Sequence, residues 1–114
     1  MANDSYCDPA TSRESPLACN LGAFTAAEKP RYGELRKSIA SAVIGQRDLA
    51  DGIALQIASD RIALADIAEW ISMERRCCPF FDFRIDVARE SGAVWLSLSG
   101  RAGVKEFITQ AFSS

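Results

Sequence analysis

Three short stretches of alternating apolar and polar residues constrain the fold of this chain more than any other feature. They are residues 53–57, 81–87 and 94–98. Successive side chains of a β-strand point to opposite faces, so each stretch predicts a strand with one apolar face. Ser91-Gly92, between the last two stretches, indicates the turn of a hairpin. Because an apolar sheet face must be buried against another element, helices are expected to cover it.

Three other segments have apolar residues at helical spacing. We expect helices over residues 30–44 with Gly45 just beyond the end, over the segment that Pro79 terminates, and near the C-terminus. The apolar stripe of the second helix is predicted to comprise Leu64, Ile67, Ala68, Ile71 and Cys78. The predicted fold is α+β: a small antiparallel sheet of three main strands packed against helices in two layers. The predicted element order is α-β-α-β-β-α.

The length and composition indicate one small globular domain. The chain has 114 residues, of which residues 1–17 are predicted to be a flexible tail and residues 18–114 a single domain. The net charge of −2 argues against nucleic-acid partners and against an anionic membrane surface. No apolar run approaches the roughly 20 residues of a membrane span, and no signal-peptide pattern opens the chain. We therefore expect a cytoplasmic protein whose four cysteines are free thiols.

The sequence contains no histidine, and this absence restricts the chemistry of any site. It excludes Ser-His-Asp and Cys-His catalysis. It also removes the commonest zinc ligand, so a metal site would have to use cysteine, carboxylate or backbone oxygen.

Cys77 and Cys78 adjoin at the end of the second predicted helix, just after Glu74, Arg75 and Arg76. At about 100° per residue, Cys78 is expected in the apolar stripe and Cys77 on its flank. The helix C-terminus and Glu74 oppose a thiolate, whereas the two arginines favour one. These opposing effects give no reason to predict a strongly lowered thiol pKa.

Three interpretations of the cysteine pair remain open. Cysteine is often buried as a small hydrophobic residue, so the pair can simply pack in the core. Together with Cys19, the pair offers three thiolates, which suit Cu(I), Hg(II), Cd(II) or As(III) better than a closed Zn(II) site. Alternatively, Cys77 is a redox nucleophile that Cys78 or Cys19 resolves. Cys19 is the easier partner, because a disulfide between adjacent cysteines is strained.

One motif joins the cysteine pair to the predicted hairpin. The chain reads E-R-R-C-C-P-F-F-D-F-R-I-D-V and then V-W-L-S-L-S-G-R-A-G-V-K-E-F. This pattern resembles a group of small, uncharacterised bacterial single-domain proteins. Their shared pattern is E-x-x-C-C-P-F-L-x-F-x-I followed by W-L-x-L-T-G-P-x-G-x-K-E-F. The resemblance covers about residues 17–112, and the chain departs from it at Phe81, Ser99 and Arg101.

The resemblance also includes Cys19, Gly52 at the start of a strand, and Arg31 in the first helix. It implies a stand-alone domain whose cysteine pair belongs to the shared pattern, and it implies no particular activity. It therefore favours Cys77, Cys78, Cys19 and Glu74 as the site.

The leading hypothesis is a cytoplasmic protein that binds a soft metal or metalloid ion through Cys77 and Cys78. Cys19 would be the third ligand, and Glu74 a ligand or supporting carboxylate. The first alternative is a thiol-redox protein or enzyme that uses the same cysteines on small thiol-reactive species. The second is a non-catalytic interaction module or homodimer in which the cysteines only pack.

Overall fold

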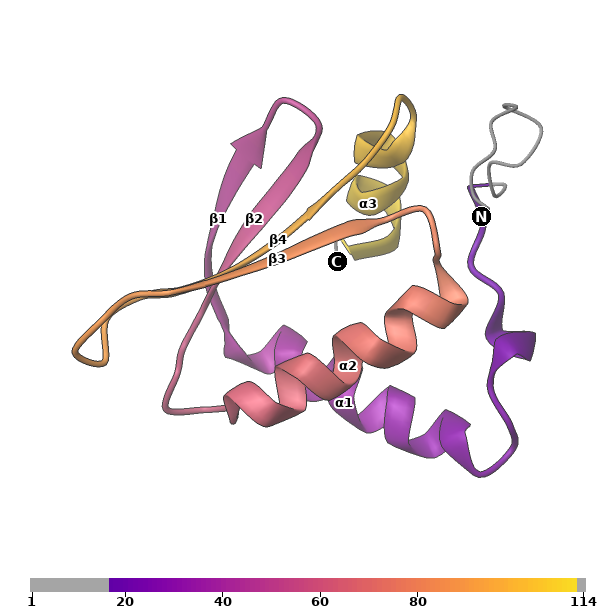
Figure 1. Cartoon of the computed structure of the whole chain (residues 1–114), viewed down its shortest axis with the longest axis horizontal. Helices are drawn as coiled ribbons and strands as arrows, with labels where there is room; N and C mark the ends of the chain where they lie inside the picture. Colours follow the sequence, from indigo (N-terminus) through magenta and orange to yellow (C-terminus); the bar gives the residue numbers. More distant parts are fainter. Residues whose placement is uncertain (1–16, 113–114) are drawn as a thin grey trace, which may run out of the picture.

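The computed structural model describes residues 17–112, so most of the tail expected over residues 1–17 lies outside the described part. The elements are η2 (Leu21–Ala23), α1 (Glu28–Ala42), β1 (Val43–Leu49), β2 (Gly52–Ile57), α2 (Leu64–Cys77), β3 (Asp82–Val87), β4 (Val94–Ser99) and α3 (Val104–Phe112). The predicted α+β class is confirmed (Figure 1). The sheet has four antiparallel strands in the order β1-β2-β4-β3, and not the three that were predicted. No helix within residues 17–112 is long and apolar enough to cross a membrane.

The additional strand, β1, follows α1 without a loop. The helix predicted over residues 30–44 ends at Ala42, and Val43 already has extended backbone angles, with φ −71° and ψ 123°. Gly45, predicted to lie just past a helix, is inside β1 opposite Gln56. The helical stripe of apolar residues continues into the strand, which conceals the boundary. Branched residues such as Val43 favour extended backbone, and pairing with β2 stabilises that conformation.

Helices cover one face of the sheet, as the two-layer prediction requires. Every second residue of β4 is buried, namely Val94, Leu96 and Leu98, and the residues between them are partly exposed. These side chains share a core with apolar residues of β2 and of all three helices. Figure 1 shows α1 and α2 side by side and α3 at another end of the strongly twisted sheet.

The buried stripe of α2 differs from the predicted one. It comprises Ile67, Trp70, Met73, Glu74 and Cys77. Leu64 is 44% exposed and Ala68 is also exposed, so both were wrongly assigned to the core. Hydropathy excludes a carboxylate from an apolar stripe, and the burial of Glu74 depends on a partner from another helix. The helix is therefore rotated relative to the prediction, and this rotation carries Cys77 into the core.

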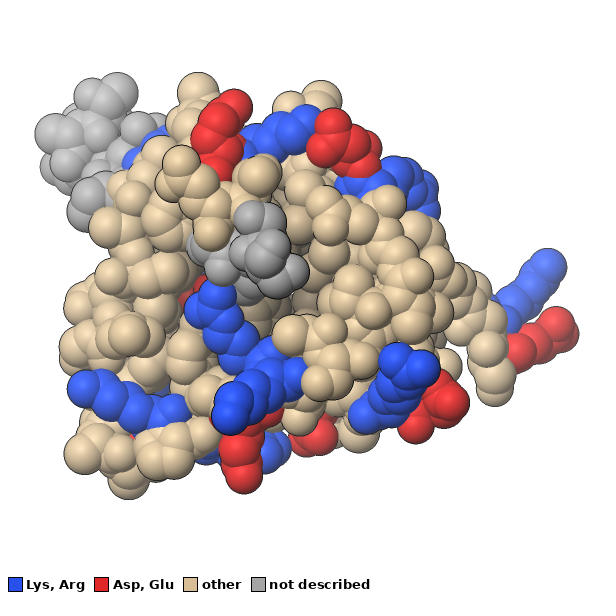
Figure 2. Space-filling model, turned by 180° about the vertical axis from the view of Figure 1, so that it is seen from behind, with Lys and Arg blue, Asp and Glu red and all other residues tan. Residues whose placement is uncertain are grey.

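Charged side chains on the surface are interspersed by sign. Figure 2 shows basic and acidic residues alternating around the face seen from behind. Several of them pair between helices: Arg31 contacts Glu69 at 2.7 Å, and Arg76 contacts Glu28 at 2.9 Å. Such exposed pairs contribute little to stability individually, but here they connect α1 with α2.

Candidate thiol and metal site

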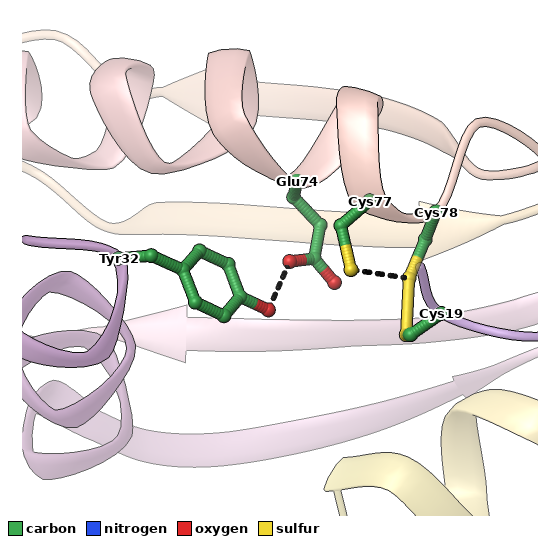
Figure 3. The surroundings of a disulfide bond; sticks show 5 residues. All are labelled: Cys19, Tyr32, Glu74, Cys77 and Cys78. Carbon is green, nitrogen blue, oxygen red and sulfur yellow. Dashed lines mark hydrogen bonds between the residues drawn. A yellow bond between two sulfur atoms is a disulfide. The ribbon is translucent and has the colours of Figure 1, made fainter. Parts of the chain in front are cut away.

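Cys19, Cys77 and Cys78 come together from two segments that are far apart in the sequence. The segment before η2 passes the C-terminal end of α2, where the backbone N–H of Asn20 donates to the carbonyl of Cys77 at 2.9 Å. The three Sγ atoms all lie within 4.8 Å of one another (Figure 3). The sequence left open whether Cys19 reaches the cysteine pair, and the tertiary structure places it there.

Cys19 and Cys78 are joined in a disulfide, and Cys77 is a free thiol. The expectation that both Cys19 and Cys78 are free thiols was therefore wrong. Their Cα atoms lie 4.9 Å apart, which is within the range that a disulfide spans without backbone movement. Only the tertiary contact between the two segments produces this distance.

The three cysteines differ in their exposure to solvent. Cys77 and Cys78 are both 0% exposed, whereas Cys19 is an exposed residue. Cys77 was predicted at the flank of the apolar stripe, and this was wrong because it lies three positions after Glu74 on the buried face. Cys78 follows the last residue of α2, and its N–H donates to the carbonyl of Glu74 at 2.7 Å. Two of the cysteines are therefore buried, and the third lies in an exposed stretch of the chain.

A buried carboxyl group lies beside the thiols. The hydroxyl of Tyr32, on α1, donates to Oε1 of Glu74 at 2.5 Å. The second oxygen, Oε2, is also buried and has no hydrogen-bond partner. Figure 3 shows the carboxyl group between the ring of Tyr32 and the sulfur of Cys77. A buried polar atom without a partner is unusual and commonly marks a proton or ligand position.

Burial determines the protonation of this cluster. It raises the pKa of the Glu74 carboxyl, although the hydrogen bond from Tyr32 and the charge of Arg36 act in the opposite direction. Burial, and then the field of Glu74, raise the pKa of the Cys77 thiol. Desolvation followed by the bond to Glu74 raises the pKa of the Tyr32 hydroxyl. All three groups therefore favour their neutral forms.

The sulfur geometry is close to that of a three-coordinate metal centre. Sγ of Cys77 lies 3.8 Å from Sγ of Cys78. A metal–thiolate bond is about 2.3 Å long for zinc, so two sulfurs on one ion lie at most about 4.6 Å apart. The sulfurs of Cys19 and Cys78 are bonded to each other, so reduction would have to let them move apart before three sulfurs could surround one ion.

Tyr32 was not among the predicted site residues. It lies 42 positions before its partner Glu74, and no local pattern of the sequence connects the two. Its position on α1 at helical spacing from the buried Leu35 and Ile39 indicated only that it would face the core.

A hollow lies on the uncovered face of the sheet, and no cysteine within residues 17–112 lines it. It has a volume of about 760 Å³, and its lining includes Ala54, Ser97 and Trp95. The guanidinium of Arg47 lies 4.1 Å from the centre of the Trp95 ring. Among the described residues, its lining offers charged, polar and aromatic side chains and no thiol.

Comparison with protein-family models, with curated proteins and with solved structures found no match to this chain. The resemblance of its motif to small bacterial proteins therefore stays an expectation.

Proposed function

We propose that the reduced protein binds one soft metal or metalloid ion through Cys19, Cys77 and Cys78. The observation that supports this most directly is the approach of three Sγ atoms to within 4.8 Å of one another. Thiolates are soft ligands and select soft ions, whereas magnesium and calcium prefer oxygen. Glu74 supplies a carboxyl group on the buried side of the sulfurs.

In this proposal the Cys19–Cys78 disulfide is the closed, oxidised form of the site. The bond occupies two of the three sulfurs, so ion binding requires its reduction. A dithiol reductant supplies two electrons and two protons, leaves as its own disulfide, and releases two cysteine thiols. Binding is therefore expected in reduced protein and not in oxidised protein.

The test is native mass spectrometry on protein reduced with a phosphine, freed of reductant, and offered Zn(II), Cd(II), Cu(I) or arsenite separately. We expect one ion per chain. Replacing Cys19, Cys77 or Cys78 singly by serine should weaken binding by about tenfold or more, because losing even a supporting partner of a ligand has about this effect. Unchanged affinity in the Cys77→Ser/Cys78→Ser double variant would refute the proposal.

Cys7→Ser is the matched control for these variants. It removes a thiol of the same chain that lies outside the described residues and is not needed for the three-sulfur cluster. We expect this variant to bind like the unmodified protein. If Cys7→Ser alone abolished binding, the ion would belong to a different set of sulfurs.

Thiol–disulfide exchange is a second candidate function, and the placement of a free thiol beside a disulfide supports it. An external thiolate would attack the sulfur of Cys19, the exposed residue of the disulfide, forming a mixed disulfide while Cys78 leaves as a thiolate that takes up a proton. The raised pKa of Cys77 argues against Cys77 as the attacking group. This candidate predicts that Cys19 of the reduced protein alkylates well ahead of Cys77 and Cys78. Equal, slow labelling of all three would count against it.

A further inference from the structure

We propose that the preferred ion is a trivalent metalloid, taken up as a neutral trihydroxide such as arsenous acid, As(OH)₃, and held by three sulfurs without net charge. This inference rests on the proposed function, because it assumes that Cys19, Cys77 and Cys78 are the ligands. It adds the chemical class of the ion, and it follows from the burial and the charges around the sulfurs.

Two of the three sulfurs lie in the hydrophobic core. Cys77 and Cys78 are 0% exposed and belong to the same buried cluster as Leu35, Ile67 and Val104. An uncompensated charge in such surroundings is strongly unfavourable. The complex that this site accommodates best is consequently a neutral one.

The charge of the complex depends on the valence of the ion. Three thiolates around Cu(I) leave two uncompensated negative charges, and around Zn(II), Cd(II) or Hg(II) they leave one. Around a trivalent ion the charges cancel. Three thiolates could bind any of these ions, but only a trivalent ion gives an uncharged complex in the apolar core.

Arg76, directly before the cysteine pair, is a basic side chain that already pairs with other groups. Arg76 is held by Glu28 at 2.9 Å and also donates to the carbonyl of Ala23 at 2.6 Å. The charge of Arg76 is therefore already compensated by Glu28.

The uptake step balances without oxidation or reduction of the metalloid. Three As–O bonds break and three As–S bonds form, while each thiol proton leaves on a hydroxide as water. Arsenic remains trivalent, and three waters are released for each ion bound. Neutral thiols are the reactants and water is the product, so the step brings no net charge into the buried interior.

The exposure of Cys19 provides a route into the site. Because Cys19 is exposed and Cys77 and Cys78 are buried, the first As–S bond can form at the surface and the next two in the interior. A neutral hydroxide enters such a site without giving up the hydration of a charge, whereas a divalent cation must lose it.

The test offers the reduced protein arsenite and Cd(II) in competition, and measures binding by native mass spectrometry and proton release in weakly buffered solution. We expect arsenite to be bound at least about tenfold more tightly than Cd(II), a difference of about 1.4 kcal/mol. The arsenic adduct should have lost three hydrogens. Arsenite binding should release no protons, and its affinity should not change between about pH 6 and pH 8, whereas Cd(II) binding releases protons.

Cys77→Ala and Cys7→Ser distinguish arsenic bound by three sulfurs from arsenic bound by only two. Cys77→Ala should convert the adduct to one that has lost only two hydrogens and retains a hydroxyl, with lower affinity. Cys7→Ser should leave the adduct unchanged. Retention of the full three-hydrogen adduct in Cys77→Ala would overturn the inference.

The other outcomes distinguish this inference from the proposed function. Tighter binding of Cd(II) than of arsenite, lost in Cys77→Ala, would overturn the trivalent assignment and leave the metal-binding proposal standing. No binding of any soft ion by the reduced protein would overturn both.

Discussion

At the scale of single residues, Glu74 is the most informative side chain. It is 0% exposed, it accepts a hydrogen bond from Tyr32, and its other oxygen has no partner. A buried carboxylate is costly, so the group shifts its pKa upward and holds its proton to higher pH. The same field raises the pKa of the neighbouring Cys77 thiol.

This shift predicts how the stability of the protein depends on pH. A carboxyl with a raised pKa in the folded state contributes stability at low pH, and that contribution is lost as pH rises through the raised value. The free energy of unfolding should therefore fall from about pH 5 upward, and Glu74→Gln should flatten this decline. Urea denaturation of both proteins across this range measures the difference.

Glu69→Gln is the control for this experiment. Glu69 is on the same helix, but it is exposed and its pKa is lowered by its pairing with Arg31, so its contribution has the opposite sign. The decline attributed to Glu74 should persist in Glu69→Gln. If the free energy of unfolding changed with pH in the same way in the unmodified protein and in Glu74→Gln, the decline would not come from Glu74.

At the scale of elements, the disulfide connects the segment before η2 to the end of α2. Two further contacts reinforce the connection: the N–H of Asn20 donates to the carbonyl of Cys77, and Arg76 lies over the ring of Phe24. The covalent bond closes a loop between cysteines 59 positions apart. It therefore restricts the unfolded chain over half of the sequence.

Reduction of this disulfide should lower the free energy of unfolding. For a loop of this length, the chain-entropy argument gives a loss of about 4 kcal/mol. The measurement is urea denaturation with and without a phosphine reductant, and Cys19→Ser should reproduce the reduced protein. Cys77→Ala keeps the bond, so it should respond to reductant as the unmodified protein does. A response to reductant in Cys19→Ser as large as in the unmodified protein would contradict this account.

At the scale of the whole molecule, the two faces of the sheet differ, and two of its four strands are at the edges. Helices bury one face, while the other face carries the hollow lined by Ala54, Ser97 and Trp95. β2 and β4 are central, and β1 and β3 are at the edges. The homodimer hypothesis stays a prediction, and sedimentation at several concentrations would test it.

The strand order predicts a gradient of hydrogen exchange. Amides of β2 and β4 pair on both sides and lie over the core, so they should exchange only through large openings of the fold. Those of β1 and β3 should exchange faster, because edge strands open locally. Exchange followed by mass spectrometry would show this, and faster exchange in β4 than in β1 would contradict the topology.

Local patterns in the sequence correctly predict the elements whose periodicity is unambiguous. Residues 53–57, 81–87 and 94–98 alternate clearly, and Pro79 prevents α2 from continuing. These local signals were sufficient for the α+β class. They failed at Val43, where a helical stripe passes directly into a strand, and at Ala68, where the hydropathy pattern selected the wrong face of α2.

The composition of the site depends on contacts between distant parts of the chain. Periodicity is a local property, whereas the contacts of Cys19 with Cys78 and of Tyr32 with Glu74 join residues 59 and 42 positions apart. The sequence placed a cysteine pair and a carboxylate at one helix end. The packing of α1 and the η2 segment against that end then buried Glu74, moved Cys77 into the core and brought in the third sulfur. The chemistry of the site depends on that burial, and burial follows from how separate elements pack.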